Sequence, residues 1–155
     1  MTTIQLTGAD IDGDPTSCTV AQFLQILHEL ALCAGTADLV WFGADMSPDL
    51  GQLERFQSEF ASRIGSLKDV RGLLRSLSFP QIDFGILIAV ATEENAPRPK
   101  IALYSEGPAG RRYQSSEVEL LAFDDSYIEV TTDRSEVLQH LNDRFPKATR
   151  IGDHR

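Results

Sequence analysis

The chain has 155 residues, of which 42% are hydrophobic and 24% charged, ordinary values for one globular domain. Its 23 acidic and 14 basic residues give a formal net charge of −9, which argues against a nucleic-acid binder and against an anionic membrane surface as partner. Two cysteines, Cys18 and Cys33, make no disulfide framework, and the first residues lack the basic and apolar stretches of a leader, so we expect a cytoplasmic protein.

The first half of the chain is rich in helix signals. Thr19 is a good N-cap before apolar residues at helical spacing, and Gly35 is expected to end that helix. Taken in order, the expected elements are a strand over residues 2–7, an acidic turn over 8–17, a helix over 19–34, a strand over 39–42, and helices over 47–60 and 66–77.

The second half is rich in strand signals. Residues 84–91 are the most apolar segment and predict a central strand. The elements expected after it are a loop over 92–99, a strand over 100–105, a turn over 106–110, strands over 118–123 and 127–132, and a helix over 135–145. Asp124, Asp125 and Ser126 form a tight turn between the last two strands, which predicts a hairpin.

These elements predict an α+β fold. We expect a single domain over residues 1–155, with a largely antiparallel sheet covered by helices on one face. Residues 147–155 are expected to be a flexible tail.

The negative charge is concentrated near the start of the chain. Residues 1–60 contain nine acidic residues and one basic residue, Arg55, so their net charge is −8. The nine are Asp10, Asp12, Asp14, Glu29, Asp38, Asp45, Asp49, Glu54 and Glu59. Residues 61–155 contain fourteen acids and thirteen bases, a net charge of −1. Solubility alone explains such asymmetry, and so does a surface matched to a basic partner.

No motif for metal binding or catalysis is evident. The acidic run from Asp10 to Asp14 fails the register of an EF-hand, because Gly13 stands at position 4 instead of 6 and Ala21 stands where a bidentate Glu is needed. No histidine pairs with another histidine or a cysteine at metal-ligand spacing, and nucleophile elbows and phosphate loops are absent from the sequence. We therefore expect no metal, no cofactor and no enzymatic activity.

Three alternatives remain open at this point. Residues 106–112 contain two glycines and two arginines and could hold an anion, although a hairpin turn is the favoured interpretation. Asp124, Asp125 and His140 could form the acidic active site of a small hydrolase or transferase, which requires the three to converge in one pocket. A structural module that assembles with itself is the third alternative.

Aromatic residues stand close to acidic ones in the sequence, a composition that suits a protein interface whose partner carries Lys and Arg. Trp41 and Phe42 precede Asp45 and Asp49, and we expect at least one of the two aromatic residues to lie in the core. The residues expected to contact a partner are Asp10, Asp12, Asp14, Asp45, Asp49, Glu54, Glu59 and Trp41.

Three blocks of sequence resemble a known group. They are LVWFGAD at residues 39–45 followed by LGQLERF at 50–56, IGSLKD at 64–69 leading to FGILIAV at 84–90, and VELLAFDDSYIEV at 118–130. Together they resemble small bacterial immunity proteins of polymorphic-toxin and contact-dependent growth-inhibition systems. The matching motifs are structural, so no individual binding residue is carried over.

The resemblance implies a cytoplasmic protein that binds and neutralises one cognate toxin domain. Many such toxins are nucleases, and a nuclease is commonly basic because it binds phosphate backbones. An acidic inhibitor would be complementary to such a toxin.

Overall fold

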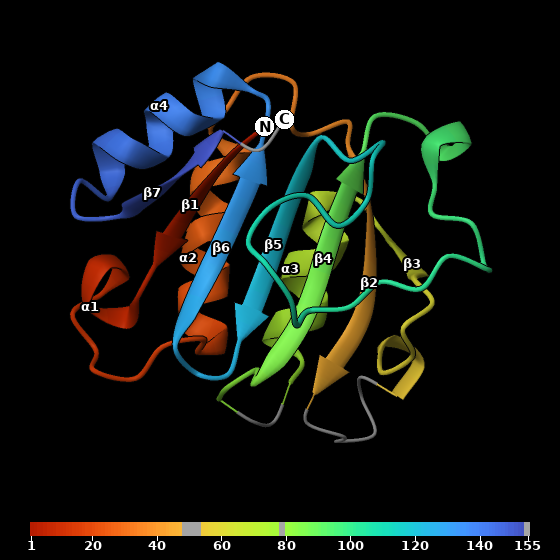
Figure 1. The fold of residues 1–155 in the computed structure, drawn as a ribbon, viewed down its shortest axis with the longest axis horizontal. Helices are drawn as coiled ribbons and strands as arrows, with labels where there is room; N and C mark the ends of the chain where they lie inside the picture. Colours follow the sequence, from red (N-terminus) through yellow and green to blue (C-terminus); the bar gives the residue numbers. More distant parts are fainter. Residues whose placement is uncertain (48–53, 78–79, 154–155) are drawn as a thin grey trace.

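The computed structural model describes residues 1–47, 54–77 and 80–153. Within these ranges the chain forms one antiparallel seven-stranded sheet with the strand order β3-β2-β4-β5-β6-β1-β7 (Figure 1). The strands are β1 (Thr2–Leu6), β2 (Val40–Ser47), β3 (Ser62–Gly65), β4 (Phe84–Val90), β5 (Val118–Phe123), β6 (Tyr127–Thr132) and β7 (Thr149–Asp153). The predicted α+β class is confirmed.

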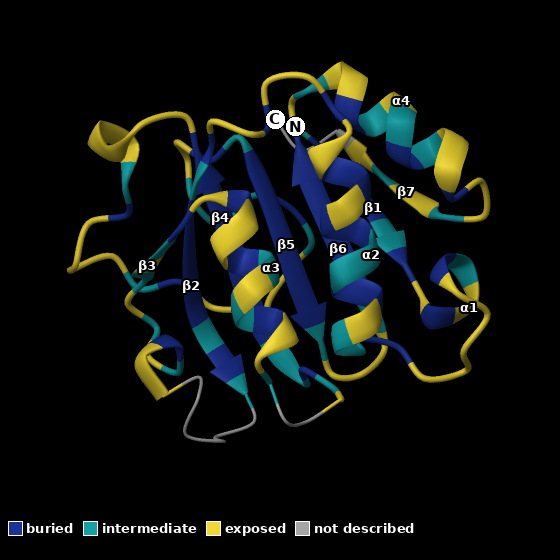
Figure 2. Cartoon of the chain, turned by 180° about the vertical axis from the view of Figure 1, so that it is seen from behind, coloured by how far each residue is buried: buried dark blue, intermediate teal, exposed yellow. Residues whose placement is uncertain are grey.

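Helices cover one face of the sheet, as Figure 2 shows from behind. They are α1 (Gly8–Ile11), α2 (Val20–Ala31), α3 (Leu67–Arg75) and α4 (Ser135–Arg144), and two short 3₁₀ turns, η1 (Glu54–Phe56) and η2 (Glu93–Asn95), lie in the connections. No helix of the described ranges is long and apolar enough to cross a membrane.

Capping boxes fix where the first three helices begin. Thr19 accepts a hydrogen bond from the backbone N–H of Gln22, whose side chain accepts one from the N–H of Thr19. Ser66 and Asp69 make the same reciprocal pair at the start of α3. Because each pair satisfies N–H groups that a helix leaves without partners, the predicted starts of α2 and α3 are confirmed.

Two cores lie on opposite faces of the sheet. Along β4, Leu87 and Ala89 face the helices and belong to the larger core, whereas Ile86 and Ile88 face away and belong to a smaller core. In the described ranges no α-helix covers the smaller core; Ala96, Leu103 and Tyr113, from the long connection after β4, pack against it instead.

Residues 104–116, called the strap below, run without regular structure across the second face (Figure 1). Glu119 of β5 holds the strap by accepting hydrogen bonds from the backbone N–H groups of Arg112 and Tyr113, at 2.7 and 2.8 Å, and from the Ser116 hydroxyl at 2.7 Å. Burial raises the pKa of the Glu119 carboxyl, and these hydrogen bonds oppose that rise.

Two predicted elements are wrong. The helix expected over residues 47–60 is absent from its described part, since Ser47 pairs with Phe84 and ends β2, and residues 54–56 form η1; residues 48–53 lie outside the description. The strand expected over 100–105 is reduced to one isolated bridge between Ala102 and Phe60; the N–H of Leu103 donates to the carbonyl of Glu59, and its side chain packs in the smaller core.

The expected tail over residues 147–155 is also corrected. Residues Thr149–Asp153 form β7, which pairs antiparallel with β1 and makes the sheet edge. Neither β7 nor β3 is predicted by the sequence, because both are short edge strands with few apolar residues.

Candidate functional site

Antiparallel pairing brings several segments that are far apart in the sequence to one end of the sheet. Leu6 at the end of β1 lies opposite Ile128, and Phe84 at the start of β4 lies opposite both Phe123 and Ser47. The segment that follows β1, the C-terminal end of β2, residues 80–83 before β4 and the β5–β6 turn therefore share this end (Figure 1).

This end of the sheet carries most of the carboxylates that the sequence singled out, and it is called the acidic end below. Its described acids are Asp10, Asp12, Asp14, Asp45, Glu54, Glu59, Asp83, Glu106, Asp124 and Asp125. Within the described ranges the bases near it are Arg55, Arg75, Lys147 and Arg112, whose guanidinium is bound to carbonyls of the chain. From β1 to β2 the sheet has four strand spacings, about 19 Å in all, so the charge forms a row and not a single cluster.

Three of these carboxylates accept hydrogen bonds that stabilise the chain around α1. Asp10 accepts hydrogen bonds from the N–H and hydroxyl of Thr7, at 2.8 and 2.9 Å. Asp12 accepts from the N–H of Asp14 and the amide of Gln22, and Asp14 accepts from the N–H of Thr16. Asp12 and Asp14 nevertheless remain exposed, so their charge still reaches solvent.

The turn between β5 and β6 presents two further carboxylates. Asp124 and Asp125 have φ angles of 45° and 58°, the left-handed backbone of a type I′ turn, and both are exposed. Partial desolvation of its carboxyl, together with a hydrogen bond and charge repulsion from Asp83, raises the pKa of Asp125 to about 6. Among the described residues, no group of three or more His, Cys, Asp and Glu could hold a metal ion.

The other predicted contact residues have mixed outcomes. Glu54 is exposed and Glu59 is half-buried, whereas Asp49 lies outside the described residues. Trp41 is a correction, because it is fully buried in the larger core and offers no surface for a partner. Phe42 is buried in the smaller core, since β2 is an interior strand with both faces covered.

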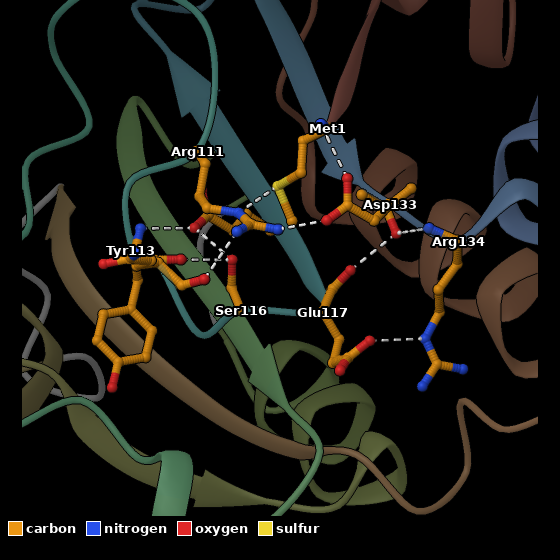
Figure 3. A network of polar contacts seen from close by, with 10 residues as sticks. Met1, Arg111, Tyr113, Ser116, Glu117, Asp133 and Arg134 are labelled. Carbon is orange, nitrogen blue, oxygen red and sulfur yellow. Dashed lines mark hydrogen bonds and ion pairs between the residues drawn. The ribbon is translucent and has the colours of Figure 1, made fainter. Parts of the chain in front are cut away.

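Several ion pairs lie at the opposite end of the sheet (Figure 3). The amino group of Met1 lies 2.8 Å from Asp133, which also binds Arg111 at 2.6 Å. Arg134 lies 3.2 Å from Glu117. No ion pair found in the described ranges involves a carboxylate of the acidic end.

The residues of the hydrolase alternative do not converge. His140 lies on α4 and makes a 2.7 Å contact with Glu29 of α2 in the helical layer, whereas Asp124 and Asp125 lie in the β5–β6 turn. Cys18 is no better a nucleophile, because burial raises the pKa of its thiol to about 11.

The anion site considered for residues 106–112 would depend on Arg111 and Arg112, and both side chains already have partners within the chain. Arg111 is paired with Asp133. The guanidinium of Arg112 donates to the backbone carbonyls of Tyr104, Ser105, Pro108 and Gly110, so it stabilises the strap from within. No sequence pattern indicates this role, since the segment is typical of a turn.

Comparison with protein-family models, with curated proteins and with solved structures produced no match.

Proposed function

We propose that this chain is an immunity-type inhibitor that binds one basic protein, a toxin domain, through its acidic end. The observation that carries the proposal is the row of carboxylates at one end of the sheet: no ion pair among the described residues involves them, whereas several lie at the opposite end. Unpaired charges of one sign attract an oppositely charged partner and speed its encounter.

The size of the row suits a protein surface better than a small-molecule site. Its span of about 19 Å from β1 to β2 lies in the range of an interface that buries about 800 Å² on each partner. In this proposal the inhibitor acts in the cytoplasm, without catalysis, by covering the basic cleft of the toxin. A basic nuclease is the partner class that fits such a surface best.

The test begins with the neighbouring genes. The proposal expects one of them to encode a protein that ends in a compact, basic C-terminal domain. That domain is expressed in cells alone, with this chain, and with the triple variant Glu54→Gln, Asp124→Asn and Asp125→Asn. These positions are exposed, and Asn is favoured in the turn, so the fold is preserved.

Growth in the presence of the wild-type chain, and loss of growth with the triple variant, support the proposal. The matched control changes three acids outside the acidic end, Asp38→Asn, Glu94→Gln and Glu136→Gln, and is expected to protect as the wild type does. A domain that stays toxic beside the wild-type chain, with no complex formed in vitro, contradicts the proposal.

A further inference from the structure

A hollow of about 380 Å³ opens at the acidic end, between the end of β2 and the strap. It is lined by Asp45, Met46, Ser47, Gln57, Phe84, Tyr104, Ser105 and Glu106. Its volume lies near the lower end of the range of small-molecule pockets, about 300–1,000 Å³.

The backbone fixes the Asp45 carboxylate in this hollow. A bulge interrupts the pairing of β2 with β4 between Ala44 and Ser47, and Asp45 adopts a left-handed φ of 51° there. Its N–H donates to the carbonyl of Ser58 at 2.8 Å, and its Oδ2 accepts from the N–H and hydroxyl of Ser105 at 2.7 and 2.8 Å. The carboxylate is thus oriented before any ligand arrives.

Two aromatic rings belong to the same hollow. Tyr104 is 56% exposed, an unusual state for a large aromatic residue in the described part of the chain. Phe84 packs edge-on against Phe123 at 5.9 Å, and Phe123 stacks on Tyr127 at 5.2 Å. The Phe84 ring is therefore held by a row of rings and presents a fixed wall.

The negative charge of the hollow has no balancing base in its lining. Asp45 and Glu106 are the carboxylates of its described lining, which contains no lysine, arginine or histidine. The nearby guanidinium of Arg112 is bound to carbonyls of the strap, those of Tyr104 and Ser105 included.

We propose that this hollow binds the guanidinium group of an arginine side chain supplied by the partner protein. The inference rests on the proposed function and deepens it. A guanidinium is planar, carries five donors and stacks on aromatic faces, so two carboxylates beside Tyr104 and Phe84 match it better than they match the compact ammonium of lysine.

The first experiment needs no toxin. The ¹⁵N-labelled chain is titrated with N-acetyl-arginine amide, and amide chemical shifts are followed by NMR. We expect saturable shifts confined to residues 45–47, 57 and 104–106, with weaker binding of N-acetyl-lysine amide and none of the neutral citrulline analogue. Shifts spread over the whole surface, equal binding of citrulline, or a response to calcium ions alone would overturn the proposal.

Two variants locate the site. Glu106→Gln removes charge and Tyr104→Ala removes the exposed ring, and each is expected to weaken arginine-amide binding by about two- to fivefold. Glu94→Gln, which lies near the opposite end of β4, is the control and is expected to change nothing. An undisturbed spectrum elsewhere verifies that each variant is folded.

The two proposals fail in different ways. If the arginine amide binds in the hollow but no basic protein binds the chain, the proposed function is wrong and the hollow remains a guanidinium site. If a basic toxin domain binds and neither Glu106→Gln nor Tyr104→Ala weakens that binding, the arginine site is wrong and the acidic end remains the interface.

Discussion

At the scale of single residues, the carboxylates divide into those that build the fold and those that face solvent. The carboxylates of Asp45 and Asp12 accept hydrogen bonds from backbone N–H groups, and Asp12 also accepts one from a side-chain amide. Asp124 and Asp125 project from a turn whose positive φ angles suit Asn as well as Asp. The second group can lose charge with little change in the backbone, so its charge can be removed while the fold is kept.

Asp125 should make stability depend on pH. Its folded pKa of about 6 lies above the value of about 3.9 for an unfolded chain, so the folded state binds the proton more tightly. The stabilising contribution is complete below about pH 3.9 and is lost as the pH rises through about 6. Urea unfolding between pH 5 and pH 7.5 should show this fall in the wild type and a smaller one in Asp125→Asn; identical slopes would contradict it.

Ionisation of Glu29 should change the pH dependence of stability in the opposite direction. Burial alone would raise the pKa of its carboxyl, but hydrogen bonds from His140 and Arg144 hold it below its ordinary value. Its contribution is therefore present above about pH 4.3 and is lost as the pH falls further. Glu29→Gln should lower the free energy of unfolding at pH 7 by about 1–3 kcal/mol, measured by urea denaturation. An unchanged value would mean that the contact between α2 and α4 contributes nothing.

At the scale of elements, the sequence predicts what local chemistry decides. The capping boxes of α2 and α3, the apolar run of β4 and the turn of the β5–β6 hairpin are all visible in neighbouring residues. The strap, β3 and β7 depend on partners far away in the chain, such as Glu119 for the strap and β1 for β7. The same holds for the acidic end, where only pairing across strands places Asp83 beside Asp125.

The strap should loosen without unfolding the sheet when Glu119 is changed to Gln. The two carboxylate oxygens accept from the N–H groups of Arg112 and Tyr113, and the amide of Gln would turn a donor toward one of them. Hydrogen exchange should accelerate at residues 112 and 113, while protection of β4 and β5 persists. Equal protection in both proteins would show that Glu119 does not hold the strap.

Removal of residues 147–155 should destabilise the protein, because β7 pairs with β1. Without β7, β1 would become an exposed edge strand with unpaired backbone groups. We expect the melting temperature to fall by at least about 5 °C, measured by circular dichroism. If the truncated chain has the same melting temperature as the full-length chain, residues 147–155 behave as a tail and do not stabilise the sheet.

At the scale of the whole molecule, the two ends of the sheet differ in how their charge is balanced. One end carries pairs such as Met1 with Asp133 and Arg63 with Glu93. The other carries a row of acids, with a polar and aromatic hollow among them. The asymmetry of charge along the sequence becomes an asymmetry in space because β1 and β2 end on the same side of the sheet.

We propose that the acidic end attracts and holds a basic protein. The most direct test of this proposal is the association rate constant with the basic toxin domain at about 0.02 M and about 0.5 M NaCl. We expect the association rate of the wild type to fall at least about tenfold at the higher salt concentration. The triple variant at Glu54, Asp124 and Asp125 is expected to associate slowly at both salt concentrations. The same rate for the wild type and the triple variant, unchanged by salt, would contradict the account.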